Sequence, residues 1–110
     1  MQLTIKEVTC YGLKISIKDY NSTEIGRAFI YVAYNDLRKK PFALMEDLFI
    51  KEGFRGQGLG RLLIQKVIQK ARELGCYKLI ATSRYSRKKV HNLYLKFGFK
   101  DYGKEFRINF

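Results

Sequence analysis

Long hydrophobic runs are missing from this sequence. No stretch of its 110 residues approaches the roughly 18 uninterrupted apolar residues of a membrane-spanning helix. The first six residues also lack the hydrophobic run of a secretory signal. Both absences favour a chain that works in the cytoplasm, without a membrane partner.

Cysteine is scarce as well. The chain has two, Cys10 and Cys76, and their separation is not a metal-binding spacing. This usage fits a reduced, intracellular protein in which both thiols serve as small buried hydrophobic side chains. We therefore expect no metal site.

Acidic residues are few relative to basic ones. The chain has 22 Lys and Arg against 10 Asp and Glu, a formal net charge of +12. Such a charge indicates acidic partners: cofactor phosphates, an acidic substrate or nucleic acid. A lysine-rich solvated surface is the simpler explanation for most of these side chains. Long-range repulsion disfavours a polyamine or another small cationic acceptor.

Repeats, low-complexity segments and linkers are absent too, so residues 1–110 are predicted to form one domain. Alternating apolar residues predict three consecutive strands in an antiparallel meander. These strands lie at about residues 13–18, 25–34 and 42–50. The second is apolar enough to be buried on both faces. Before them, residues 2–10 carry a weak strand signal and Tyr11-Gly12 is predicted to be a turn.

The second half of the chain predicts helices alternating with strands. The expected elements are a helix at about 58–74, a strand at 77–83, a second helix ending at Gly98, and one or two strands within 102–110. Gly75 suits a helix end, and Ser86 is placed to cap the second helix. A right-handed crossover makes the strand at 77–83 parallel to the one before the first helix. The predicted class is α/β with a mixed sheet.

A glycine-rich turn stands between the strand at 42–50 and the first helix. Its three glycines leave no side chain in the way of a ligand and tolerate positive φ. The helix after it offers free backbone N–H groups and the positive end of its dipole, which together make an anion site. Arg55 and Arg61 add positive charge beside it. We predict that this turn holds a pyrophosphate.

Two common phosphate motifs do not match this turn. No Gly-Lys-Ser/Thr follows, as the nucleoside-triphosphate loop requires, and the glycines are not spaced G-x-G-x-x-G. Residues 55–60 read Arg-Gly-Gln-Gly-Leu-Gly. This Arg-x-x-Gly-x-Gly pattern resembles the acetyl-coenzyme A (acetyl-CoA) loop of the Gcn5-related N-acetyltransferase (GNAT) family. The alternative is a strand-to-helix turn without a ligand.

A second segment, residues 90–99, resembles the family's other signature, a helix ending in Tyr-x-x-x-Gly-Phe. Here it is formed by Tyr94, Gly98 and Phe99. The resemblance covers about residues 42–110. It implies an acyl-CoA N-acyltransferase-like fold and an acetyl-CoA-dependent N-acetyltransferase, which moves the acetyl group from the thioester to a primary amine by direct attack.

The N-terminal half departs from the family pattern. The family places two helices between its first and second strands, whereas only residues 10–12 separate the corresponding strands here. The chain thus resembles a short member without those helices, which form one wall of the acceptor cleft. Their absence exposes apolar sheet surface, so we expect a second copy, as a homodimer, or another protein to cover it. The open side suits a bulky acceptor, whether a small molecule or a protein.

The resemblance implies the residues that bind the cofactor. Backbone amides of the turn would hold the pyrophosphate, and the end of the preceding strand would pair with the pantetheine amides like an added strand. A backbone N–H of Leu48 or Phe49 would polarise the thioester carbonyl. The implied cofactor-binding residues are Leu48, Phe49, Ile50, Arg55, Gly56, Gln57, Gly58, Leu59, Gly60 and Arg61.

Two residues are the predicted catalytic groups. The resemblance places Tyr94 near the sulfur, where its phenol would protonate the leaving thiolate; otherwise it is a core aromatic. Glu46 and Asp47 lie in an apolar strand, where carboxylates are costly unless used or paired, and alternation would send them to opposite faces. Glu46 is favoured as the base or amine-binding group. The alternative is a salt bridge to a Lys or Arg.

One position departs from the second signature. Many members carry an asparagine seven residues before the tyrosine, whereas this chain has Arg87. Arg87, with Arg84, Lys88 and Lys89, would contact the 3′-phosphate or adenine end of the cofactor, or else form a solvated helix start. Two other functions stay open: a basic nucleic-acid-binding module and a non-catalytic coenzyme A-binding regulatory protein.

Overall fold

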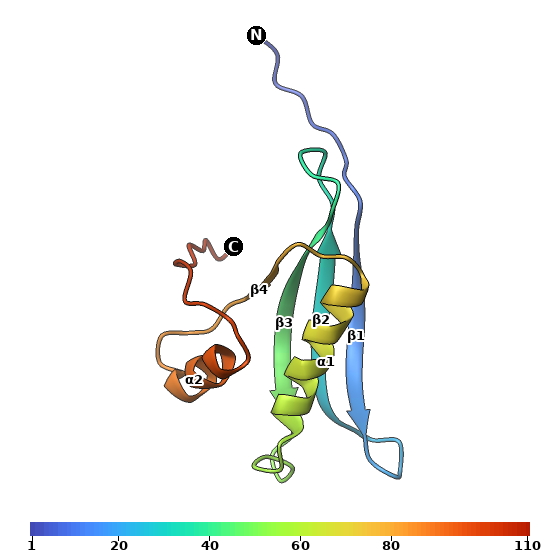
Figure 1. Ribbon diagram of the computed structural model, residues 1–110, viewed down its shortest axis with the longest axis vertical. Helices are drawn as coiled ribbons and strands as arrows, with labels where there is room; N and C mark the ends of the chain where they lie inside the picture. Colours follow the sequence, from blue (N-terminus) through green and yellow to red (C-terminus); the bar gives the residue numbers. More distant parts are fainter.

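The computed structural model describes residues 1–110 and shows a four-stranded sheet with two helices (Figure 1). The elements are β1 (Cys10–Lys18), β2 (Glu24–Ala33), β3 (Phe42–Ile50), α1 (Leu59–Glu73), β4 (Leu79–Ala81) and α2 (Lys88–Lys96). The strand order is β1-β2-β3-β4. The first three strands are antiparallel neighbours, and β4 lies parallel to β3 after the α1 crossover. The α/β class, the meander and the order of helices are therefore confirmed.

The core is the layer between α1 and one face of the sheet. Apolar residues at helical spacing, including Leu63 and Val67, turn one side of α1 toward β2 and β3. Beneath it, Ala28, Ile30 and Val32 recur at every second position of β2 and are fully buried. Figure 1 shows α1 lying along this face. The apolar residues at helical spacing in α1 and those at alternate positions in β2 thus pack together in one core cluster.

No helix covers the opposite face of the sheet, which we call the bare face. It carries Arg27, Phe29 and Tyr31 of β2, with Leu44 and Glu46 of β3 paired beside them. The rings of Phe29 and Tyr31 stack with centroids 6.2 Å apart, and Tyr31 is 43% exposed. The prediction that β2 is buried on both faces is wrong, because no helix precedes β1 to cover the second one.

The first strand does not begin within residues 2–9, where a weak strand signal lies, but at Cys10. Residues 1–9 form no strand and extend away from the sheet (Figure 1). Tyr11-Gly12 lies inside β1 and is not a turn. Gly12 pairs with Tyr31, and a Cβ on Gly12 would meet the Tyr31 ring at 2.9 Å. This glycine is therefore explained by the close approach of a ring rather than by chain reversal.

The C-terminal part of the chain contains fewer strand residues than predicted. β4 has three residues instead of the seven predicted at 77–83, and no strand forms within residues 97–110. The residue at the N-cap of α2 is Arg87 rather than Ser86, and no side chain caps the helix. β-forming composition alone does not make a strand where no neighbouring strand is available to pair with it.

The cysteine prediction holds only in part. Both thiols are free, but Cys10 is exposed and Cys76 is partly buried. Cys10 begins β1, which is an edge strand, so nothing packs over it. Neither helix has the length and apolar composition needed to cross a membrane.

Candidate functional site

β3 and β4 pair over a short stretch and then separate. Their ladder joins residues 43–45 to residues 79–81. β3 continues to Ile50, and beyond residue 45 it is paired only with β2. The edge of residues 46–50 that faces away from β2 therefore has no strand partner, so its backbone groups are available to a ligand. Ligands of α/β sheets typically bind outside the carboxyl ends of parallel strands, which is where this edge lies.

A β-bulge interrupts β3 at the start of this free edge. Phe29 is paired with Glu46 and Arg27 with Phe49, so two residues of β3 stand opposite a single residue of β2. One of them, Asp47, has φ 53° in the left-handed region. The bulge breaks the simple alternation predicted for Glu46 and Asp47 and re-aims the backbone after it. Sequence reasoning missed the bulge; the tolerance of Asp for this conformation was the one available signal.

The glycine turn opens α1 without a cap. Gly56 and Gly58 have φ of 80° and 81°, and Gly58 is the N-cap residue. No side chain accepts from the first N–H groups of α1, and its first turn contains no acidic residue. A Cβ added at Gly56, Gly58 or Gly60 would meet no atom within 4 Å. An open approach, unsatisfied donors and no competing carboxylate together fit a diphosphate.

Arg55 ties the turn to the end of β3. Its Nε donates a hydrogen bond to the carbonyl oxygen of Ile50 at 2.8 Å, and its guanidinium lies 5.5 Å from the centroid of the Phe49 ring. Arg61 is exposed on the first turn of α1. The fold thus brings every residue predicted to bind the cofactor to one edge, from the last three residues of β3 to the start of α1.

Tyr94 reaches the site from α2. Its ring packs against the core cluster and lies 5.3 Å from that of Phe99. Burial raises the pKa of the Tyr94 phenol; the charge of Glu46 raises it further, while that of Arg87 lowers it. Tyr94 is thus both a core aromatic and a protonated donor at neutral pH. The Tyr94 phenol thus lies close enough to Glu46 of β3 and to Arg87 at the start of α2 for both charges to affect its pKa.

Glu46 lies half-buried on the bare face beside the bulge. None of the four ion pairs in the structure includes it, and its carboxylate accepts no hydrogen bond. The predicted alternative, a salt bridge to a nearby Lys or Arg, is therefore not formed. A carboxylate without a partner is available to a cationic group of a substrate.

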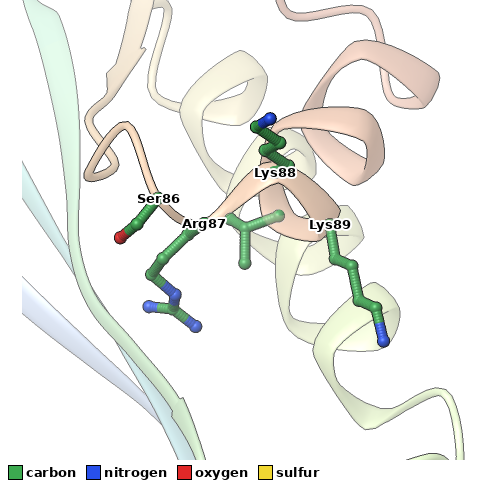
Figure 2. A pocket seen from close by; sticks show the side chains of 5 residues that line it. Ser86, Arg87, Lys88 and Lys89 are labelled. Atoms are coloured by element: carbon green, nitrogen blue, oxygen red, sulfur yellow. The ribbon is translucent and has the colours of Figure 1, made fainter.

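The start of α2 is a shallow basic depression. Its lining residues are Ser86, Arg87, Lys88, Lys89 and Val90 (Figure 2). In Figure 2 the Arg87 side chain extends toward β3, whereas Lys88 and Lys89 point in other directions. His91, the only histidine, has its Nε2 2.8 Å from the carbonyl oxygen of Arg84 and so fixes the loop before the helix. This residue has a structural role.

Comparisons with known proteins show which family this chain resembles. Residues 13–99 match the model of the Acetyltransferase (GNAT) family. Thialysine N-epsilon-acetyltransferase of Bos taurus is 31% identical over 77 residues, which are 70% of this chain and 45% of that protein. Glucosamine 6-phosphate N-acetyltransferase of Trypanosoma brucei brucei is 34% identical over 65 residues, which are 59% of this chain and 42% of that protein.

Solved structures agree with the sequence matches. A Trypanosoma brucei acetyltransferase superposes with a TM-score of 0.83 at 25% identity, covering 90% of this chain and 69% of that one. Glucosamine-6-phosphate N-acetyltransferase of Arabidopsis thaliana, at 20% identity and a TM-score of 0.78, shares the fold. The chain spans less than half the length of the curated relatives it matches. With the family model matched over most of its length, the chain belongs to the acetyltransferase (GNAT) family.

Proposed function

We propose that this chain binds acetyl-CoA along β3 and the glycine turn and transfers the acetyl group to a primary amine. The observation that carries the proposal is continuity: the unpaired edge of residues 46–50 leads into the uncapped start of α1. An extended diamide followed by a diphosphate needs such a row of backbone groups followed by an anion site. Enzymes of this family use acetyl-CoA as co-substrate.

The chain's backbone would hold and polarise the thioester. N–H groups of residues 56–61 would bind the pyrophosphate, and the free edge of β3 would pair with the pantetheine arm. In this proposal the bulge at Asp47 would turn a following N–H group, of Leu48 or Phe49, toward the acyl carbonyl. Fixed donors at that oxygen stabilise the charge that develops there as the amine attacks.

Glu46 and Tyr94 would handle the protons. The amine nitrogen bonds to the acetyl carbon, the C–S bond breaks, and the amine loses a proton to Glu46, directly or through a water. Tyr94 gives its phenolic proton to the leaving thiolate. Its raised pKa would keep that proton in place at neutral pH, and the influence of the Glu46 charge on that pKa supports a site that contains both the acid and the base.

Two further roles extend the proposal. The basic start of α2, including Arg87, would bind the 3′-phosphate of coenzyme A, which the depression of Figure 2 supports. A second copy of the chain would cover the apolar part of the bare face around Tyr31 and Leu44. The named relatives act on thialysine and glucosamine 6-phosphate, both of which are amines, so a primary amine is the proposed acceptor class here.

Acetyl-CoA binding and turnover test the proposal separately. Isothermal titration with acetyl-CoA should show binding at micromolar to millimolar concentrations, and absence of binding at millimolar acetyl-CoA would overturn it. Release of coenzyme A with a panel of amines should follow, read by chromatography because the exposed thiol of Cys10 would react with thiol reagents. Binding without release would favour the non-catalytic coenzyme A-binding protein.

The nucleic-acid alternative has its own test. The net charge of +12 is the observation that favours it. Mobility shifts with duplex and single-stranded oligonucleotides should be measured over a range of salt. Absence of binding at low salt would remove this alternative.

A further inference from the structure

The charged end of the bare face lies directly beside the bulge. On this face Arg27 and Phe29 are neighbours along β2, while Glu46 and Phe49 stand opposite them on β3. The cation of Arg27 and the carboxylate of Glu46 therefore lie diagonally across the two strands on one face. The rings of Phe29 and Phe49 fill the other two corners.

Arg27 forms no ion pair: its charge lowers the pKa of the Glu24 carboxyl, but that carboxylate is paired with Lys14. Arg27 takes part in none of the four ion pairs, and its side chain donates no hydrogen bond within the protein. Its guanidinium instead lies 4.8 Å from the centroid of the Phe49 ring, which is 41% exposed. The ring holds the guanidinium at the surface without satisfying its donors, so they remain available to an anion.

The neighbouring cation on this face, Lys14, differs from Arg27 because it forms an ion pair. Lys14 forms a 2.7 Å ion pair with Glu24 and lies 5.7 Å from the centroid of the Phe29 ring. Its charge is already balanced. The Arg55 guanidinium also lies near the Phe49 ring, 5.5 Å from its centroid, but its Nε donates to the carbonyl oxygen of Ile50. Arg27 is thus the one cation of this cluster without a polar partner.

We propose that the acceptor is an amine carrying an anionic group, bound across this diagonal with its nitrogen at Glu46 and its anion at Arg27. This inference rests on the proposed function, because it uses Glu46 as the group that receives the amine. Phe29 and Phe49 would contact the apolar stem between the two charges. A diamine would bring its second cation to the unpaired guanidinium, so this local charge disfavours polyamines in addition to the net charge.

6-Aminohexanoate is the probe, because its extended stem can span side chains that are diagonal neighbours on two strands, whose Cα atoms are typically about 7–8 Å apart. Its neutral isostere, 6-aminohexanamide, differs only in charge. We expect kcat/KM for the acid to exceed that for the amide by on the order of 10-fold, the size of one charge-assisted hydrogen bond. 3-Aminopropanoate is too short to reach both groups and should lose the advantage.

Two matched variants locate the anion contact. Arg27→Gln should bring the ratio of acid to amide close to one while leaving acetyl-CoA affinity unchanged. Lys14→Gln removes a cation from the same face, but one already paired, and should leave the ratio as in the wild type. An equal loss in both variants would mean that only the general positive field matters and would overturn the assignment of Arg27.

A measurement on the wild type keeps the proposal testable if Arg27→Gln does not fold. Hexanoate should inhibit acetylation of 6-aminohexanoate competitively, and hexanamide should not. Glucosamine 6-phosphate compared with glucosamine asks whether phosphate serves as the anion in place of carboxylate. The inference is wrong if 6-aminohexanoate reacts no faster than 6-aminohexanamide and glucosamine 6-phosphate reacts no faster than glucosamine. Acetyl-CoA binding with turnover of neutral amines would still support the proposed function.

Discussion

At Gly58, the absence of a side chain leaves the start of α1 open to an anion. Gly58 and Gly75 flank the two ends of α1, have φ of 81° and 74°, and leave open space where a Cβ would be. Gly58→Glu should abolish acetyl-CoA binding because it places a carboxylate in the anion site. Gly75→Glu introduces the same charge and a similar backbone strain of about 1 kcal/mol, yet should bind normally. Isothermal titration of both checks this, and unchanged affinity in Gly58→Glu would refute the turn assignment.

Tyr94 combines packing with chemistry, and substitution by phenylalanine separates the two. Tyr94→Phe keeps the ring against Phe99 but removes the proton donor. We expect kcat to fall by about 100-fold, within the range for a general acid, while the dissociation constant for acetyl-CoA changes little. Steady-state kinetics and titration measure the two effects. Full turnover would leave Tyr94 with a packing role alone.

The pKa of Tyr94 provides a test of the cluster that is independent of activity. The negative charge of Glu46 disfavours the phenolate, so Glu46→Gln should lower the Tyr94 pKa; Arg87 favours it, so Arg87→Gln should raise it. Because a proton donor is active below its pKa, loss of turnover at alkaline pH should move to higher pH in Arg87→Gln. NMR titration of ¹³C-labelled tyrosine, with Tyr94→Phe for assignment, measures the shifts. Movement in the same direction would contradict the arrangement.

At the scale of the element, the bulge divides β3 into a half that is paired within the sheet and a half with a free edge. Its first half pairs on both sides within the sheet, and its second half leaves one edge free. Asp47 makes the division at φ 53°. Asp47→Val should lower the free energy of unfolding by about 1–2 kcal/mol, since a β-branched residue is strained there.

Asp47→Gly supplies the matched control, because glycine accepts positive φ without strain. It should unfold at the same urea concentration as the wild type or a higher one, and it should keep acetyl-CoA binding. Urea titrations of the two variants provide the comparison. Equal stability of the valine and glycine variants would mean that the bulge conformation stores no strain.

At the scale of the whole molecule, the two faces of the sheet are unequal. One is sealed by α1, whereas the other exposes Tyr31 above Gly12. We expect the wild type to form a homodimer through this face and Tyr31→Glu to be monomeric, because a buried carboxylate without a partner is costly. Light scattering over a range of concentrations measures the mass. Tyr20→Glu, in a fully exposed turn, should remain dimeric, and a monomeric wild type at all concentrations would exclude this interface.

Local pattern alone determined much of this protein. The sequence predicted that residues 63, 67 and 71 face the core and that a glycine turn opens the first helix, and the structure confirms both. The sequence also predicted the helix that carries Tyr94. Helix period and turn chemistry depend on residues only a few positions apart, so a sequence states them directly. The ten residues of the predicted cofactor site all lie between residues 48 and 61, so a short window of sequence contains them.

Contacts between distant segments decided the rest. The bulge at Asp47 appears only when β2 and β3 are in register, and the free edge of β3 exists only because β4 ends at Ala81. By sequence alone Gly12 predicts a turn, whereas the Tyr31 ring that explains this glycine lies across the sheet. Strand pairing and burial depend on partners far away in the chain, which no local window contains. The sequence therefore determined the helices, the antiparallel meander and the glycine turn, whereas the tertiary structure alone decided which strand edge stays open and which charges share a face.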